Sequence, residues 1–275
     1  MSSTAATPVA AALHAAGPRV RRPLPGWVIS TAGVAGLFLV WALATAGDWI
    51  DPVYLPSPWS LGTELVTLFR DGYKGASVWQ HIGVSLFRTL TGFAIGVALG
   101  VPVGLATGYS RVGQALVSPL MAFIRPIPPI AFIPMAVLYF GLGELGKVVL
   151  IAFTAFNYMQ INAHAGAASV PLTHHRAARS LGLTRFQVFT RIVLPSSVPH
   201  LFTGFKVAMA LSWAVVVAAE LVGAQRGLGF MISDAAQLFR IPVVFIGIAL
   251  IGVTGLLLNA LIDLLERRVV HWRNR

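Results

Sequence analysis

The chain has 275 residues, of which 56% are hydrophobic and only 11% charged, and its formal net charge is +11. A composition this apolar excludes a soluble globular domain and indicates an integral membrane protein with a single membrane domain. The absence of cysteine excludes disulfides, thiolate metal sites and thiol nucleophiles. The basic residues are distributed among short segments that flank apolar runs, which argues against nucleic-acid binding.

The first predicted elements are a tail and an apolar helix. Residues 1–25 are rich in Ala, Ser and Pro and carry three arginines, so we expect a mobile cytoplasmic tail. The run Trp27–Ala46 ends in a sequence that resembles a signal-peptide cleavage site. Its length of about 20 residues and the spans that follow favour a retained membrane helix.

The segment from Asp48 to Gln80 is polar, and we expect it outside the membrane. Ser57 and Pro58 are typical of a helix cap and first residue, so a helix should begin there and lie along the outer interface. The second predicted span, Ile82–Thr107, carries glycine at every fourth position from Gly92 to Gly108. This pattern predicts close packing against another helix, either of the same chain or of a second subunit.

Proline interrupts the third predicted span, Val112–Phe140. The stretch Arg125-Pro126-Ile127-Pro128-Pro129, with Pro134 after it, removes backbone donors and forbids a straight helix. Broken helices at membrane depth are tolerated only against protein or a water-filled cavity. We therefore expect this stretch to line a translocation path, where Arg125 either meets an anionic solute or caps free carbonyls.

The segment Gly141–Val148 satisfies G-x-G-x-x-G and nearly satisfies the phosphate loop. No βαβ pattern surrounds it, and Val148 stands where a magnesium-binding hydroxyl residue would be, so we expect no nucleotide here. The remaining predicted spans are Lys147–Ala165, Val198–Gly223 and Ile241–Ile262. Asn157, Gln160 and Asn162 in the fourth span suit hydrogen bonds between helices.

The predicted cytoplasmic segments hold far more basic than acidic residues, whereas the outer segments hold both in similar number. This asymmetry predicts six spans with both termini in the cytoplasm. We expect His81, His164, His174 and His175 to be interfacial or solvated, and no histidine spacing indicates a metal site.

The charges inside the predicted spans suggest a gate. Arg88, Arg125, Lys206 and Glu220 are costly there unless they face a partner or water. We predict that Arg88 or Arg125 pairs with Glu220, either to hold an outer gate shut or as a static link between helices. Lys206 should reach toward the inner surface.

A basic stretch, Val170–Pro195, separates the fourth and fifth spans. Gly182 suits the left-handed position after a helix, Thr184 and Gln187 form a capping box with Leu183 and Val188 at the staple positions, and Pro195 should stop the next helix. We therefore expect a helix-turn-helix on the membrane surface.

Within this stretch, a motif resembles the E-A-A-x3-G-x9-I-x-L-P loop of permease subunits of bacterial ABC importers. The residues that match in position are Arg176, Ala177, Ala178, Gly182, Ile192, Leu194 and Pro195. Arg176 replaces the usual Glu, so no ion pair of that acid is carried over. The segments Arg125–Pro134, Phe140–Lys147, Ala218–Leu221 and Arg226–Ile232 are similar to the nitrate, sulfonate and taurine branch, with the taurine permeases nearest.

The resemblance implies an all-α protein of the type I importer permease fold, with a membrane domain at residues 26–270 and a coupling loop at 170–195. It implies a multi-pass protein of the bacterial inner membrane that pairs with a second copy, two cytoplasmic ATPase subunits and an extracytoplasmic solute-binding protein. ATP and magnesium would bind the ATPase, so this chain is expected to be no enzyme and to hold no cofactor. The expected solute is taurine or another aliphatic sulfonate, with nitrate, bicarbonate or a vitamin precursor as alternatives.

Two other classes compete with this interpretation. Broken helices and buried charges also fit an ion-coupled secondary transporter, although the loop motif argues against it. A membrane-embedded enzyme lacks support, because no paired carboxylates or catalytic motif lie in the spans.

Overall fold

The computed structural model describes residues 25–47, 51 and 53–271. The predicted tail before Pro25, and Arg273 and Arg275, lie outside the described residues. The chain divides between Pro52 and Val53 into two compact units. The described residues of the first unit form the apolar helix α2 (Gly26–Ala46).

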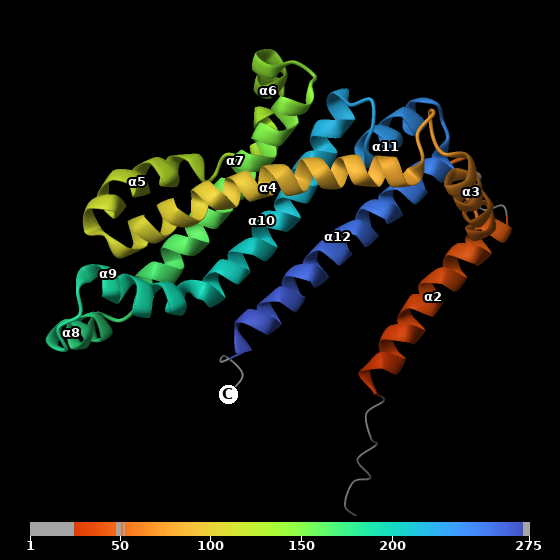
Figure 1. Ribbon diagram of the computed structural model, residues 1–275. Helices are drawn as coiled ribbons and strands as arrows, with labels where there is room; N and C mark the ends of the chain where they lie inside the picture. The colour runs from red at the N-terminus through yellow and green to blue at the C-terminus, as the bar shows by residue number, and fades with distance from the viewer. Residues whose placement is uncertain (1–24, 48–50, 52, 272–275) are drawn as a thin grey trace, which may run out of the picture. The chain divides into compact units, whose positions relative to one another are not determined.

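The second unit is helical throughout, apart from turns and one isolated β-bridge, Tyr73 to Ala76, within the described residues (Figure 1). Its elements, in chain order, are α3 (Pro58–Asp71), α4 (Val78–Tyr109), α5 (Arg111–Ile124), the 3-10 turn η1 (Pro129–Phe132), α6 (Ile133–Phe140), α7 (Glu144–Ala168), α8 (Leu172–Ser180), α9 (Arg185–Val188), the π-helical turn η2 (Phe189–Val193), α10 (Leu194–Gly223), α11 (Leu228–Gln237) and α12 (Ile241–Val269).

Three helices in the described chain are long and apolar enough to cross a membrane: Val78–Tyr109, Arg185–Gly223 and Ile241–Val269. The pair α5 and η1–α6, bent by 81°, makes a fourth if it is one broken span. Proline thus breaks the third predicted span as expected, while Pro134 falls in the first turn of α6, where a missing N–H costs little.

The predicted span at α7 is helical but falls short of this criterion, and Ser30–Ala46 of α2 is a shorter apolar helix. Within its own unit, α7 packs most extensively against α4 and next against α10. Its buried residues include Thr154, Asn157 and Gln160. A helix enclosed by other helices needs no continuous apolar face toward lipid, which explains its lower hydropathy.

The glycine ladder of α4 packs against α7 of the same chain. A Cβ added at Gly96 would lie 2.5 Å from the carbonyl oxygen of Ala152, and one at Gly100 would lie 2.7 Å from that of Phe156. The contacts advance in step from Gly92 to Gly108, so the two helices run in the same direction with their backbones in contact. The structure therefore decides between the two alternatives for the ladder in favour of packing within the chain.

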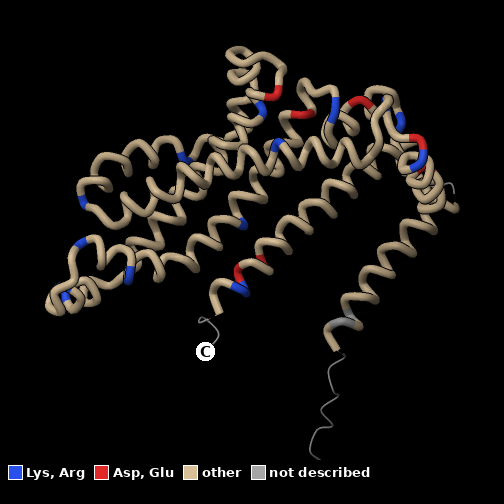
Figure 2. Tube along the Cα trace, viewed as in Figure 1, with Lys and Arg blue, Asp and Glu red and all other residues tan. Residues whose placement is uncertain are grey.

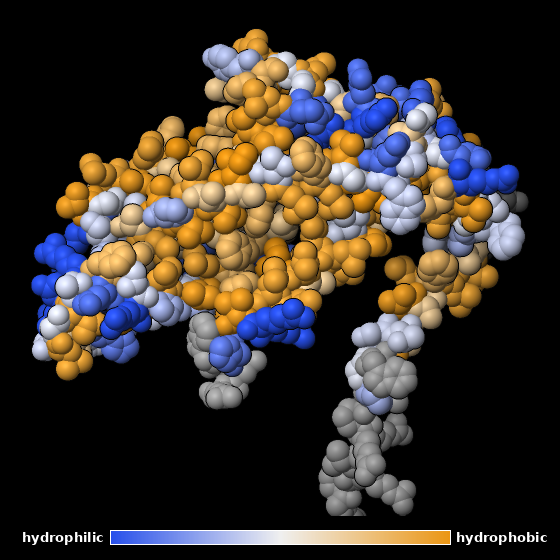
Figure 3. Space-filling view, viewed as in Figure 1, coloured by the Kyte–Doolittle hydropathy of each residue, from blue (hydrophilic) through white to orange (hydrophobic). Residues whose placement is uncertain are grey.

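The surface of the second unit divides by polarity. Lys and Arg without Asp or Glu lie at the α8–α9 end, whereas the acids gather near the start of α7, around α11 and on the last turns of α12 (Figure 2). Apolar side chains cover the helices between these regions (Figure 3).

Candidate functional site

The predicted coupling loop forms two short helices joined by a turn at Gly182. Gly182 has φ +82°, its N–H donates to Arg179 O at 3.0 Å, and the N–H of Leu183 donates to Ala178 O at 3.1 Å. These two bonds close the C-terminus of α8 in the left-handed conformation predicted for Gly182. The turn is therefore set by local backbone chemistry.

The capping box that begins α9 is also present. Thr184 Oγ1 accepts from the N–H of Gln187 at 3.2 Å, and Gln187 Oε1 accepts from the N–H of Thr184 at 2.9 Å. Val188 is buried and Leu183 half-buried, as staple positions require.

The prediction that Pro195 stops the following helix is wrong. The chain stays helical from Arg185 to Gly223, and Pro195 lies in the first turn of α10. The π-helical turn Phe189–Val193 precedes it, and the N–H of Leu194 donates to Phe189 O, five residues back. This widened turn accommodates the proline ring, which would otherwise clash with the carbonyl four residues before it.

The motif residues differ in exposure. Arg176, Ala177, Gly182 and Pro195 are exposed, whereas Ala178 is buried. Ile192 and Leu194 are half-buried against the core that includes Met159 and Val193. The buried and half-buried residues fix the loop to the neighbouring helices, while the others face away from this core.

Tyr109, at the end of α4, ties the loop to the helices and is a residue that sequence reasoning missed. Its hydroxyl donates to Arg185 O at 3.0 Å, and its ring stacks on His175 at 5.8 Å and contacts Phe189 at 5.4 Å. An aromatic residue at the very end of an apolar run was the available signal.

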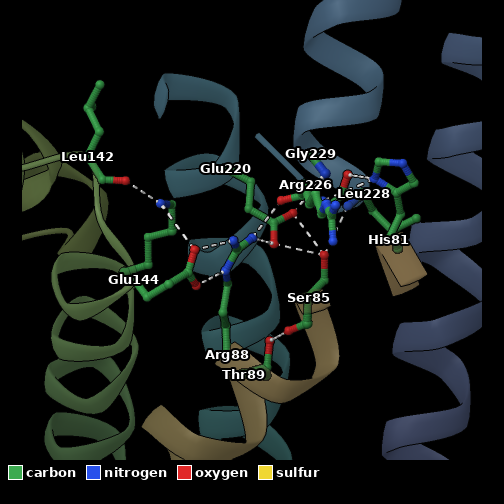
Figure 4. Close-up of polar contacts among 12 residues, drawn as sticks. His81, Ser85, Arg88, Thr89, Leu142, Glu144, Glu220, Arg226, Leu228 and Gly229 are labelled. Atoms are coloured by element: carbon green, nitrogen blue, oxygen red, sulfur yellow. Dashed lines mark hydrogen bonds and ion pairs between the residues drawn. The ribbon is translucent and has the colours of Figure 1, made fainter. Parts of the chain in front are cut away.

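The second candidate site joins α4, α7 and α10 around Arg88 (Figure 4). We call it the Arg88 cluster, and it consists of His81, Ser85, Arg88, Glu144, Glu220 and the backbone of Arg226–Gly229.

Arg88 is 2% exposed and binds two carboxylates. Its Nε and Nη2 donate to the two oxygens of Glu144, both at 2.5 Å, and its Nη1 donates to Glu220 at 2.7 Å and to Arg226 O at 2.8 Å. The predicted pairing of Glu220 with Arg88 is therefore present. Arg125 is exposed, and no hydrogen bond or ion pair within the described chain involves its side chain.

Glu220 is held on several sides. Besides Arg88, the Ser85 hydroxyl donates to it at 2.8 Å and the N–H of Gly229 at 2.9 Å. Gly227 adopts φ +126°, and a Cβ there would lie 2.5 Å from a Glu220 carboxyl oxygen. This glycine is required for the turn to approach the acid so closely.

Glu144 is attached more loosely than Glu220. Its side chain is 64% exposed, and its only other ion pair within the described chain is with Lys147 at 3.9 Å. The hydrogen bonds from Arg88 lower the pKa of Glu144. It therefore stays ionised at neutral pH.

His81 corrects the prediction that this side chain is interfacial or solvated. It is fully buried, its Nδ1 accepts from the N–H of Gly227 at 3.1 Å, and its Nε2 lies 3.1 Å from Tyr73 O. The Gly227 turn, 146 residues away in sequence, covers the ring. Only the tertiary fold brings these segments together.

Two cavities adjoin the two sites. One of about 900 Å³ lies beside the Arg88 cluster and is lined by Arg88, Glu144, Gln225 and Arg226 among others. Another of about 760 Å³ is lined by Tyr109, Arg111, His175, Arg179 and Arg185 at the coupling-loop end.

The other polar predictions have mixed outcomes. Lys206 pairs with Asp263 and Glu266 of α12, both at 2.5 Å, near the last turns of that helix. Gln160 donates across to Thr107 at 3.4 Å, as predicted. Asn162 does not link helices, because its amide donates to Tyr158 O in its own helix at 2.8 Å.

Comparisons with known proteins agree with the loop motif. The family described as "binding-protein-dependent transport system inner membrane component" matches residues 96–271. The taurine transport system permease protein of Escherichia coli (strain K12) is 36% identical over 262 residues, which cover 94% of this chain and 95% of that protein. The bicarbonate transport system permease protein of Synechococcus elongatus is 32% identical, covering 91% and 92%.

A third relative is the putative aliphatic sulfonates transport permease protein of Bacillus subtilis, 30% identical over 90% of this chain and 89% of that protein. Among solved structures, an inward-facing MetNI methionine ABC transporter aligns with a TM-score of 0.61 at 21% identity, covering 70% of this chain and 97% of the matched chain. At that identity the likeness shows the fold alone.

Proposed function

Because the chain belongs to the family of binding-protein-dependent transport system inner membrane components, we propose that it is the membrane-spanning subunit of an ATP-driven importer whose solute is taurine or another aliphatic sulfonate. It is a permease of the inner membrane. The choice of taurine as the solute is supported by the 36% identity, over nearly the whole chain, to a taurine permease.

In this proposal the chain spans the membrane six times with both termini in the cytoplasm and works as a pair of identical subunits. Two cytoplasmic ATPase subunits, which hold ATP and magnesium, bind at residues 170–195, and a solute-binding protein delivers solute on the opposite side. The acid-free basic surface at α8–α9 supports a cytoplasmic position for that end.

The helical connection between the two candidate sites supports a mechanical role. The chain is helical without interruption from Arg185, in the coupling loop, to Gly223, just past Glu220. A movement that the ATPase imposes on α9 therefore reaches the Arg88 cluster through one helix. We propose that this movement opens and closes the link between Glu220 and Arg88, which acts as an outer gate.

The broken segment is the proposed wall of the translocation path. Arg125, Pro126, Pro128 and Pro129 lie at or near the bend between α5 and η1, and the Arg125 side chain is exposed. A cation there suits a small anion in transit, because passage requires weak and hydrated contacts.

Bicarbonate is the second candidate solute, favoured by the 32% identity to a bicarbonate permease. Nitrate and vitamin precursors remain alternatives within the same mechanism. An ion-coupled secondary transporter would require uptake without ATP.

The test is uptake by proteoliposomes that contain the chain with its ATPase and binding protein. We expect ATP-dependent accumulation of radiolabelled taurine that ethanesulfonate inhibits and ionophores do not. Accumulation of bicarbonate but not taurine would overturn the proposed solute. Accumulation that needs no ATP and stops with an ionophore would overturn the ATP-driven mechanism.

A further inference from the structure

Arg88 binds two carboxylates that differ greatly in how firmly they are held. We infer that Glu144 occupies an anion site on Arg88, and that the sulfonate group of a solute displaces Glu144 from this site during transport. The inference rests on the proposed function, because it assigns a residue-level site to the proposed solute class.

Glu220 is the more firmly held of the two partners of Arg88. Its side chain is fully buried and accepts hydrogen bonds from Ser85 and from the N–H of Gly229. Without the Glu220 carboxylate, these donors and the Arg88 guanidinium would be buried with one acceptor fewer, which would lower the free energy of unfolding.

Glu144 is the exchangeable partner. Its side chain is 64% exposed, so it can be hydrated where it stands if it leaves the arginine. It also lies at the first residue of α7, next to the Gly141–Gly143 turn, so its departure disrupts no helical hydrogen bond.

The geometry of the contact fits a sulfonate. Nε and Nη2 of Arg88 point side by side at the two oxygens of Glu144 (Figure 4). This fork recognises any planar or tetrahedral oxyanion that presents two oxygens of one group. A sulfonate presents such a pair and carries a single negative charge, as the carboxylate does, so the charge in direct contact with the guanidinium of Arg88 is the same before and after the exchange.

The cavity beside the cluster supplies the access and the room. It measures about 900 Å³, and Arg88, Glu144 and Arg226 line it. Arg88 itself is 3% exposed at the side chain, so it becomes available to solute only when Glu144 moves. Glu144 is thus an internal competitor that keeps the site closed to weaker anions.

A single reporter thiol tests this inference, because the chain has no natural cysteine. Gln225 lines the same cavity and is exposed, so the Gln225→Cys variant places a thiol there. The full complex with the ATPase, in nanodiscs, is labelled with a maleimide, and the rate is measured with rising ethanesulfonate. Sodium chloride at equal ionic strength and neutral methanesulfonamide are the controls.

We expect ethanesulfonate to slow labelling, whereas neither control does. Adding Glu144→Gln should lower the half-protecting concentration about tenfold, because a neutral amide competes less well than a carboxylate for the arginine. Adding Arg88→Lys, which keeps the charge but loses the fork, should abolish protection in complexes that still retain the ATPase. Equal protection by chloride, or no change with Glu144→Gln, would overturn the inference; the Glu144→Gln result decides alone if Arg88→Lys fails to assemble.

Labelling and uptake together distinguish a failure of the anion site from a failure of the proposed function. Taurine uptake without ethanesulfonate protection would refute the site and leave the importer intact. Protection that meets these expectations, in a complex that accumulates only bicarbonate, would uphold the anion site and refute the proposed solute.

Discussion

At the scale of single residues, the Arg88 cluster depends on matched burial of opposite charges. Arg88 and Glu220 are both almost fully buried, and each is satisfied by several partners. A buried ion pair adds little net stability, but losing one partner is severe because the other charge remains without compensation.

Replacing Glu220 by Ala should therefore lower the free energy of unfolding by about 3–5 kcal/mol. The matched control is Glu64→Ala, since Glu64 pairs with Arg240 at 2.6 Å on the surface, where loss should cost about 0–1 kcal/mol. Thermal unfolding of the purified protein in detergent compares the two. Equal losses would contradict the role assigned to Glu220.

Substitutions of the single residue Gly182 test the role of the turn between α8 and α9. No atom lies within 4 Å of a Cβ added there, so a substitution acts through the backbone alone. Gly182→Val should destabilise the turn by about 1–2 kcal/mol, because valine is strained at positive φ. We expect the variant to retain less ATPase during purification and to take up less solute. Gly182→Asn, which tolerates positive φ, should retain most of both; a variant pair that behaves alike would refute the turn's role.

At the scale of elements, α4 and α7 form the rigid centre of the second unit. Their backbones touch along the glycine ladder, so no side chain of α4 separates them. Because a backbone carbonyl oxygen of α7 lies 2.4–2.9 Å from the Cβ position of each ladder glycine, the neighbouring helix must shift as a whole to admit a Cβ.

Gly96→Ala should therefore destabilise the protein by about 1–3 kcal/mol through overpacking against Ala152 and Ala155. Gly83→Ala in the same helix meets no atom within 4 Å and should be neutral or stabilising by up to about 1 kcal/mol, because Ala favours helix over Gly. The unfolding temperatures of the two variants measure these changes in stability. Similar values for the two variants would show that the ladder is not in close contact.

The segment α9–η2–α10 is a continuous helix that contains one π-helical turn, and in the proposed mechanism it transmits movement from the coupling loop. Pro195 follows this turn and removes the donor that would otherwise return the chain to α-helical bonding. In the proposed mechanism, we expect this turn to bend more easily than the α-helix on either side of it.

Replacing Pro195 by Ala should raise the unfolding temperature and lower the taurine taken up per ATP hydrolysed, because the turn can close into an α-helix. Pro199→Ala removes a proline further inside α10 and should raise stability without changing this ratio. Transport and hydrolysis assayed together give the ratio. Unchanged coupling in Pro195→Ala would argue against the π-helical turn as a compliant element.

At the scale of the whole molecule, the proposed topology places α3 and α8 on opposite sides of the membrane. Arg70 in α3 and Arg179 in α8 are both exposed, and the chain lacks cysteine, so single thiols can report on each side.

An impermeant maleimide should label the Arg70→Cys variant in right-side-out vesicles and the Arg179→Cys variant only in inverted ones. Labelling of both from the same side would refute the six-span arrangement. The coupling loop would then no longer face the ATPase.

Local patterns predicted the local structure well. The cap at Ser57, the left-handed Gly182 and the Thr184–Gln187 box all depend on residues within one helical turn, and all are present. The failure at Pro195 has a local cause too: a π-helical turn has no simple sequence signature, so a proline that usually ends a helix was accommodated within one.

By itself, the amino-acid sequence determined the membrane class, the helical segments, the proline break between α5 and α6 and the loop motif, because apolar periodicity, proline and caps act within a few residues. Only the tertiary structure decided that the glycine ladder faces α7, that Glu220 pairs with Arg88 rather than Arg125, and that His81 is buried. Those contacts join residues that lie about 50 to 150 positions apart. Their choice depends on which helix faces pack together, and neighbouring residues in the sequence do not encode that.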